Sequence, residues 1–252
     1  MPRPRRPSKT PPKELPPCDG PKLRLFQHYR SCIQWLERLD KDDEDEDKDS
    51  PTEGYVFRAK IRDTEYAIKV ERRLLLGAPG GAYGRIQEAI EKGYLKSDIV
   101  VPCHGFFFLR ETDEKVLQGR NIDLDADQVD PEYQRATPGG YRPRAIVKDL
   151  ASADPSIDQD NLKQIIGDIA RLNSQPIFNM DIRLDNYRDG KLVGFGSSWT
   201  EPHILLDALD DKAADESRLA DRTKFGQMLK DEKIPNIQKI RPVHPMRLRR
   251  RI

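Results

Sequence analysis

The residues with the clearest chemical potential are a lysine inside an apolar run and an aspartate followed by an asparagine. The lysine is Lys69, in "YAIKV", and the pair is Asp181 and Asn186, in "DIRLDNY". A carboxylate can accept the proton of a substrate hydroxyl, an amide oxygen can bind Mg²⁺, and an ammonium can hold phosphate oxygens. These three roles together point to phosphoryl transfer from ATP.

The stretch after this pair departs from an active phosphotransferase. A turn at Asp189-Gly190 leads to Gly194-Phe-Gly, where protein kinases have an aspartate that binds the metal. Glycine supplies no oxygen ligand from its side chain. A glycine-rich phosphate cover is also almost missing, because only Gly54 precedes the strand pair that contains Lys69. We therefore expect ATP and Mg²⁺ binding at Lys69 and Asn186 to be weakened or absent, with Asp181 as a residual base position.

A structural alternative exists for each of these residues. Lys69 can form an ion pair with an acid beside its strand, and Asp181 and Asn186 can simply hydrogen-bond the backbone of their own loop. Trp199 and His203 fit packing and helix capping better than ligand binding.

The elements that must position these residues follow from periodicity. Alternation over 55–61 and 66–70, joined by a polar turn at 62–65, predicts a β-hairpin with Lys69 and Ile68 on opposite faces. We predict further strands within 99–109 and at 144–150, and a long insertion loop over 111–143. Apolar spacing predicts helices over 21–39, 82–96, 158–172, 203–210 and 213–231.

Composition limits the class of protein. The chain has 252 residues, of which 36% are hydrophobic and 35% charged, with a net charge of +1. Cys18, Cys32 and Cys103 make no CxxC pair, so we expect a reducing intracellular compartment and no structural metal. No apolar run is long enough to span a membrane, and the N-terminus lacks the apolar core of a secretory signal.

Charge is segregated along the chain. Residues 1–18 form a proline-rich basic arm and residues 233–252 a basic tail, both of which we expect to be disordered. These ends could contact DNA or act in nuclear targeting, or they could be solvated tails. Residues 40–49 contain eight acids and two lysines, which is typical either of a site for a basic partner such as a histone tail or of a solvated loop.

The chain resembles the fungal kinetochore-subunit family of the Fta-two type of the Sim-four complex. The likeness runs from about residue 19 to residue 210, and it rests on "DGPKL" at 19–23, "YAIKV" at 66–70, "AYGRI" at 82–86, "RAIVKDL" at 144–150, "DIRLDNY" at 181–187 and "LVGFGSSWTEPH" at 192–203. Members of this family resemble small, divergent protein kinases. The family pattern has a glutamate where this chain has Pro79, so the usual ion-pair partner of Lys69 is replaced and Glu71 or Glu88 would have to substitute.

The resemblance and the residue pattern together predict an α+β, two-lobed protein-kinase-like fold over residues 19–232. The small β-rich lobe would cover about 19–109 and the short helical lobe about 151–232. The first functional hypothesis is a catalytically impaired, nuclear scaffold that binds kinetochore or chromatin proteins. The alternatives are a small atypical phosphotransferase that uses Lys69, Asp181 and Asn186, and a chromatin-binding adaptor that acts through its basic tails and acidic loop.

Overall fold

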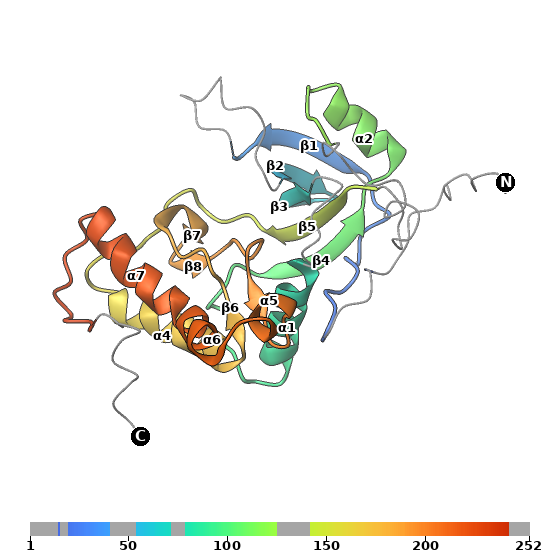
Figure 1. Cartoon of the computed structure of the whole chain (residues 1–252). Coiled ribbons are helices and arrows are strands. Elements are labelled where there is room, and N and C mark those ends of the chain that lie inside the picture. Colours follow the sequence, from blue (N-terminus) through green and yellow to red (C-terminus); the bar gives the residue numbers. More distant parts are fainter. Residues whose placement is uncertain (1–14, 16–19, 41–53, 72–78, 125–141, 242–252) are drawn as a thin grey trace. The chain divides into compact units, whose positions relative to one another are not determined.

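The computed structural model describes residue 15 and residues 20–40, 54–71, 79–124 and 142–241. The predictions for the basic arm, for most of the acidic run and for the end of the basic tail lie outside these residues. Internal contacts divide the chain into two units (Figure 1). The first unit comprises 1–17, 23–76 and 103–150, and the second comprises 18–22, 77–102 and 151–252.

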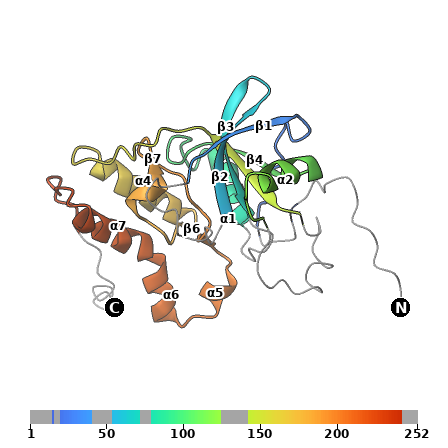
Figure 2. The same cartoon turned by 90° about the horizontal axis from the view of Figure 1, so that it is seen from above.

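The first unit contains a five-stranded antiparallel sheet with the order β1-β2-β3-β5-β4 (Figures 1 and 2). Its strands are β1 (Ile33–Arg38), β2 (Gly54–Ile61), β3 (Thr64–Glu71), β4 (Cys103–Phe108) and β5 (Arg144–Asp149). One face of the sheet forms the core of the unit with Trp35, Phe57, Ile68 and Val147 among its members. The opposite face of β3 carries Lys69.

The predicted β-hairpin is confirmed. β2 and β3 pair in continuous register from Gly54 opposite Glu71 to Ile61 opposite Thr64. The connection is shorter than predicted, because Arg62 adopts a φ of 57° and closes the turn with Asp63. Strand β5 confirms the predicted strand at 144–150 and pairs with β3 from Tyr66 to Glu71.

The predicted helix over 21–39 is wrong. Its second half is the edge strand β1, in which Trp35 lies opposite Ala59 and packs edge-on against Phe57 with ring centroids 5.5 Å apart. The apolar residues fit both a helical stripe and a half-buried strand. Pairing with β2 decides between them, because it satisfies the backbone groups of the hairpin edge.

The stretch 111–143, predicted to be a loop, begins with helix α2 (Glu111–Gln118). Its composition is polar, but acidic side chains at Glu111, Asp113 and Glu114 in the first turn interact favourably with the helix dipole. Leu117 anchors the helix by joining the core of the first unit. Residues 125–141 lie outside the described part of the chain.

The described part of the second unit is mainly helical. Two short strand pairs and one 3-10 turn lie between its helices. Its helices are α1 (Pro79–Glu91), α4 (Leu162–Ser174), α5 (Ile204–Asp207), α6 (Asp211–Arg218) and α7 (Ala220–Asp231). The predicted helix over 213–231 is in fact two helices, which meet at Leu219. The remaining elements are β6 (Ile177–Phe178) paired with β9 (Trp199–Thr200), the 3-10 turn η1 (Leu184–Asn186), and β7 (Tyr187–Arg188) paired with β8 (Lys191–Leu192).

The chain is therefore an α+β protein, as predicted. None of the helices in its described residues is long and apolar enough to cross a membrane. Cys32 and Cys103 are free thiols, and Cys18 lies outside the described residues.

Candidate functional site

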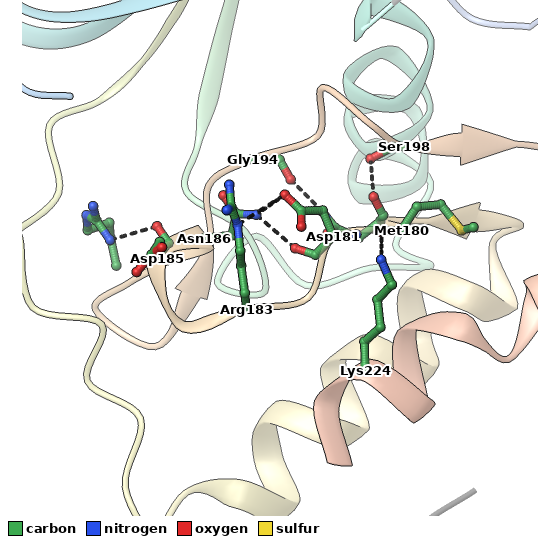
Figure 3. Close-up of polar contacts among 10 residues, drawn as sticks. Met180, Asp181, Arg183, Asp185, Asn186, Gly194, Ser198 and Lys224 are labelled. Atoms are coloured by element: carbon green, nitrogen blue, oxygen red, sulfur yellow. Dashed lines mark hydrogen bonds and ion pairs between the residues drawn. The ribbon is translucent and has the colours of Figure 1, made fainter. Parts of the chain in front are cut away.

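The loop that contains Asp181 is hydrogen-bonded to a buried carboxylate on α7. Asp221 is only 2% exposed, and its two oxygens accept the backbone N–H groups of Asn179 and Met180, each at 2.7 Å. The side-chain amide of Asn173 donates to the same carboxylate at 2.8 Å. Burial raises the pKa of Asp221, and these three donors oppose that effect. Lys224, also on α7, donates to the carbonyl of Met180 (Figure 3).

Asn179 ties the loop to the Gly-Phe-Gly segment. Its side-chain nitrogen donates to the carbonyl oxygen of Gly194, while its side-chain oxygen accepts the backbone N–H of Asp181 at 3.1 Å. Ser198 donates through its hydroxyl to the carbonyl of Asn179 at 3.3 Å. A single buried amide therefore fixes both sides of the candidate site.

Asp181 and Asn186, which the sequence singled out, lie in direct contact. The amide nitrogen of Asn186 donates to Oδ2 of Asp181 at 2.7 Å and to the backbone carbonyl of Asp181 at 2.8 Å (Figure 3). Arg183 adds an ion pair from Nε to the same carboxylate oxygen at 3.3 Å. The two residues are thus joined by hydrogen bonds within their own loop. Asn186 bonds the backbone, as the structural alternative expected, whereas the Asp181 carboxylate contacts the side chains of Asn186 and Arg183.

Gly194 faces the other end of the Asn186 amide. A Cβ atom built on Gly194 would lie 2.7 Å from Oδ1 of Asn186, closer than real Cβ contacts allow. The amide oxygen of Asn186 therefore lies where a side chain at residue 194 would begin, the position at which the sequence pattern of kinases led us to look for a metal-binding aspartate. Residue 194 itself offers no side-chain oxygen, the kind of ligand that Mg²⁺ prefers.

The apolar middle of the Gly-Phe-Gly segment is anchored to α1. Phe195 is 1% exposed and packs edge-on against Tyr83, with ring centroids 5.3 Å apart. The hydroxyl of Tyr83 donates to the carbonyl of Val193 at 2.9 Å. The backbone that carries Gly194 is therefore fixed by both packing and hydrogen bonding.

The turn between Asn186 and Gly194 confirms the predicted Asp189-Gly190 reversal. Both residues have positive φ values, 51° and 72°, which is the geometry of a tight two-residue hairpin. The carboxylate of Asp189 accepts the hydroxyl and the backbone N–H of Ser152, the latter at 3.2 Å. These hydrogen bonds hold the pKa of Asp189 below its usual value, first through the hydroxyl and then through the N–H.

Lys69 belongs to the first unit, where it lies on β3 between Val56 of β2 and Ile146 of β5. Of the two acids considered as its partner, Glu71 is buried and pairs with Arg144 at 3.1 Å. Glu88 pairs with Lys92 along α1 at 2.9 Å.

Two charged residues of these regions were missed by the sequence analysis, Asp221 and Lys148. Lys148 lies on β5 and is 8% exposed. Burial, followed by repulsion from Lys69, lowers its pKa to about 8. In both cases the sequence places a charged residue in or directly after an apolar pattern, which indicates burial. Asp221 occupies the apolar stripe of a predicted helix, four residues before the buried Phe225, and Lys148 follows the apolar run Ala145–Val147.

Trp199 and His203 take the structural roles that the sequence suggested. Their rings stack with centroids 5.2 Å apart and an interplanar angle of 14°. Nδ1 of His203 accepts the backbone N–H of Leu205 at 3.3 Å, at the start of α5. Partial burial lowers the pKa of His203, so the neutral ring is favoured.

A comparison with protein-family models finds one match to this chain, described as Kinetochore Sim4 complex subunit FTA2. The match covers residues 11–76 and 80–199, which is most of the chain, and it includes Lys69, Asp181, Asn186 and Gly194. It skips residues 77–79, so Pro79 lies outside it. A search of curated proteins gives no significant match. The extent of the family match shows that the chain belongs to the family of kinetochore Sim4 complex subunit FTA2.

Proposed function

We propose that this chain is a nuclear, catalytically impaired, kinase-like subunit that acts as a protein-interaction scaffold at the kinetochore. Family membership implies a kinetochore role, protein partners within a complex and a chromosomal location. The scaffold role and the kinase-like fold go further and rest on the arguments below.

The kinase-like hypothesis is supported by the order of the elements along the chain. A lysine on the third strand of an antiparallel sheet is followed by helix α1, and later by a loop with Asp181 and Asn186 and by the Gly-Phe-Gly segment. Protein kinases use a strand lysine, a catalytic-loop aspartate with an asparagine five residues later, and a metal-binding triplet in this order.

The impaired chemistry is supported chiefly by the contact between Asn186 and Gly194. Phosphoryl transfer depends on positioning and on neutralising charge, and the metal ions supply much of that charge. Here Oδ1 of Asn186 faces a glycine, while Nδ2 of Asn186 donates to the carboxylate of Asp181. Asp181 also accepts the ion pair from Arg183. The arrangement holds a loop together, and it lacks the second acidic ligand that catalysis would need.

A replacement experiment in cells tests this proposal. The tagged chain with Asp181→Asn should give the same centromeric signal and chromosome-segregation fidelity as the unchanged chain, because asparagine still offers an oxygen to Asn186. Asp221→Ala should abolish both, because it removes the anchor of the loop. Loss of segregation fidelity in Asp181→Asn, at unchanged protein level and unchanged thermal stability, would contradict the scaffold role.

The alternative function, a small atypical phosphotransferase, makes a different prediction. It requires ATP binding that depends on Mg²⁺ and on Lys69. A ligand at about 100 times its dissociation constant stabilises a protein by about 2.7 kcal/mol, which corresponds to a shift of roughly 5–10 °C in the unfolding temperature. A Mg²⁺-dependent shift of that size, lost in Lys69→Ala, would favour the enzyme over the scaffold.

A further inference from the structure

A short stretch of the second unit exposes two leucines to solvent. Leu205 on α5 is 52% exposed, and Leu209, which lies just after this helix, is 39% exposed. Leu206, by contrast, is only 4% exposed and anchors the helix to the unit. The two exposed leucines are therefore left over from the packing of α5, and another segment could bury them.

The chain around these leucines is strongly acidic. Residues 201–216 contain six acids and one lysine. The basic side chains of α6 already have partners, in the pairs Lys212–Glu216 at 3.7 Å, Arg218–Glu201 at 2.7 Å and Arg218–Asp215 at 3.0 Å. Asp207 and Asp211 are exposed, and neither has an ion-pair partner within the described part of the chain. The surface therefore suits a segment that is both apolar and basic.

The sequence contains one segment with this complementary chemistry in the same unit. Residues 242–252, "PVHPMRLRRRI", have four arginines and no acid, and Leu248 and Ile252 are among their apolar residues. These residues lie outside the described part of the chain, and they are assigned to the second unit, as α5 is. Arginine is well suited to pair with carboxylates, because its planar guanidinium can donate two parallel hydrogen bonds to one of them.

The connection to this segment is long enough for such a contact. Gln238 is fixed at the start of α4, where its side-chain oxygen accepts the backbone N–H of Lys163 at 2.7 Å and its side-chain nitrogen donates to the carbonyl of Asp160. Helices α7 and α6 lead from this end of the unit to α5, and α6 contacts both of the others (Figures 1 and 2). Laid end to end they measure about 30 Å, whereas eleven extended residues span up to about 36–40 Å.

We propose that residues 242–252 bind the α5–α6 face of their own chain, which consists of Leu205, Asp207, Leu209 and Asp211. The apolar residues of the segment would contact the two leucines, and its arginines would pair with the two carboxylates. Exposed ion pairs and a small apolar contact are individually weak. A covalent connection compensates for this weakness, because it holds the segment at an effective concentration that is roughly millimolar for a short flexible linker.

Trypsin cleavage after Arg247, followed by mass spectrometry of the full chain, tests the contact from the side of the face. Cleavage needs the released segment, so its rate follows the population in which the contact is open. The double variants Leu205→Ser/Leu209→Ser and Asp207→Asn/Asp211→Asn should each be cleaved at least about threefold faster than the unchanged chain. Tyr94→Ser and Asp231→Asn are the matched controls and should leave the rate unchanged, because Tyr94 is 63% exposed and Asp231 is exposed in the same unit.

Hydrogen exchange tests the same contact from the side of the segment. Leu205, Asp207 and Leu209 each donate a backbone hydrogen bond within residues 203–209, so their exchange can be followed. Leu248→Ser/Ile252→Ser should speed this exchange by about threefold, because the released segment no longer holds the stretch closed. This variant leaves α5 unchanged, so it separates loss of the contact from damage to the helix. Raising the salt from about 50 to about 500 mM should speed both cleavage and exchange by screening the ion pairs.

Three results would overturn the proposal. The first is equal cleavage in the face variants and their controls, and the second is unchanged exchange of residues 205–209 in the segment variant. The third is protection that grows as the protein concentration rises from about 1 to about 100 µM, because a second copy would then supply the segment. None of these measurements involves a partner protein or the kinetochore, so the contact stands or falls independently of the proposed scaffold role.

Discussion

The strongest structural prediction concerns Asp221, whose carboxylate anchors the loop that contains Asp181. Asp221→Ala leaves the N–H groups of Asn179 and Met180 without their acceptor, and both groups bond this carboxylate at 2.7 Å. An unsatisfied buried donor costs about 1–3 kcal/mol. The free energy of unfolding of the second unit should therefore fall by roughly 2–6 kcal/mol.

Two further variants make this prediction specific. Asp221→Asn keeps one acceptor oxygen but turns an amide nitrogen toward one of the N–H donors, so we expect an intermediate loss of about 2 kcal/mol. Asp231→Ala is the matched control, because Asp231 is an exposed acid at the end of the same helix and accepts a hydrogen bond from the exposed side chain of Gln227. Its effect should stay within about 0.5 kcal/mol.

Urea unfolding followed by the fluorescence of Trp199 is a suitable assay. The chain has two tryptophans, and Trp199 lies opposite Phe178, directly before Asn179. The other, Trp35, can be replaced by phenylalanine, because its indole nitrogen is buried with no hydrogen-bond partner in the described residues. A loss below about 1 kcal/mol for Asp221→Ala, or the same loss for Asp231→Ala, would refute the anchoring role.

Three more predictions follow from the contacts described above. Between pH 8 and pH 10.5 the stability of the unchanged chain should rise by about 3 kcal/mol relative to Lys148→Met, because the folded lysine pKa of about 8 lies below its ordinary value of 10.5. A pH-independent difference between the two chains in urea unfolding would refute this. Gly194→Asp should destabilise the chain by about 1–3 kcal/mol through its clash with Asn186, and should cost less when combined with Asn186→Ala, so an additive double mutant would count against the clash. Ser152→Ala should raise the pKa of Asp189 toward its ordinary value in an NMR titration, and an unchanged pKa would mean that the serine does not stabilise the carboxylate.

Local patterns were sufficient to predict the elements that depend on local geometry. The hairpin of β2 and β3 was predictable because its side chains alternate strictly and because its turn is short. Asp181 and Asn186 were picked out by a short spacing, since Asn186 lies five positions after Asp181, and η1 brings the two into contact. Helix α4 was also found, although the structure starts it at Leu162 instead of residue 158.

The failures share a physical cause, which is that distant parts of the chain decide the outcome. The apolar residues of 21–39 have the spacing of an amphipathic helix. Residues 33–38 nevertheless form a strand, because they pair with the edge of β2. Helix α2 is polar apart from Val116, which is exposed, and Leu117, which reaches the core, so its composition indicated a loop. The role of Asp221 depends on backbone groups about forty residues earlier in the chain, and no local spacing reveals such a contact.

The contacts of Gly194 show that the loop of Asp181 and Asn186 is held together by hydrogen bonds that a glycine at residue 194 permits. Asn179 bonds the backbone carbonyl of residue 194, a contact that any residue could make. The atoms nearest to a side chain at residue 194 belong to Asn186, and glycine leaves the amide of Asn186 room to bond Asp181 at both the carboxylate and the carbonyl. Glycine supplies no side-chain oxygen at this position and is compatible with the hydrogen bonds of the loop. The contacts of Asp181 and Asn186 thus account for these two residues as parts of the loop structure, as our proposal of an impaired, kinase-like scaffold requires.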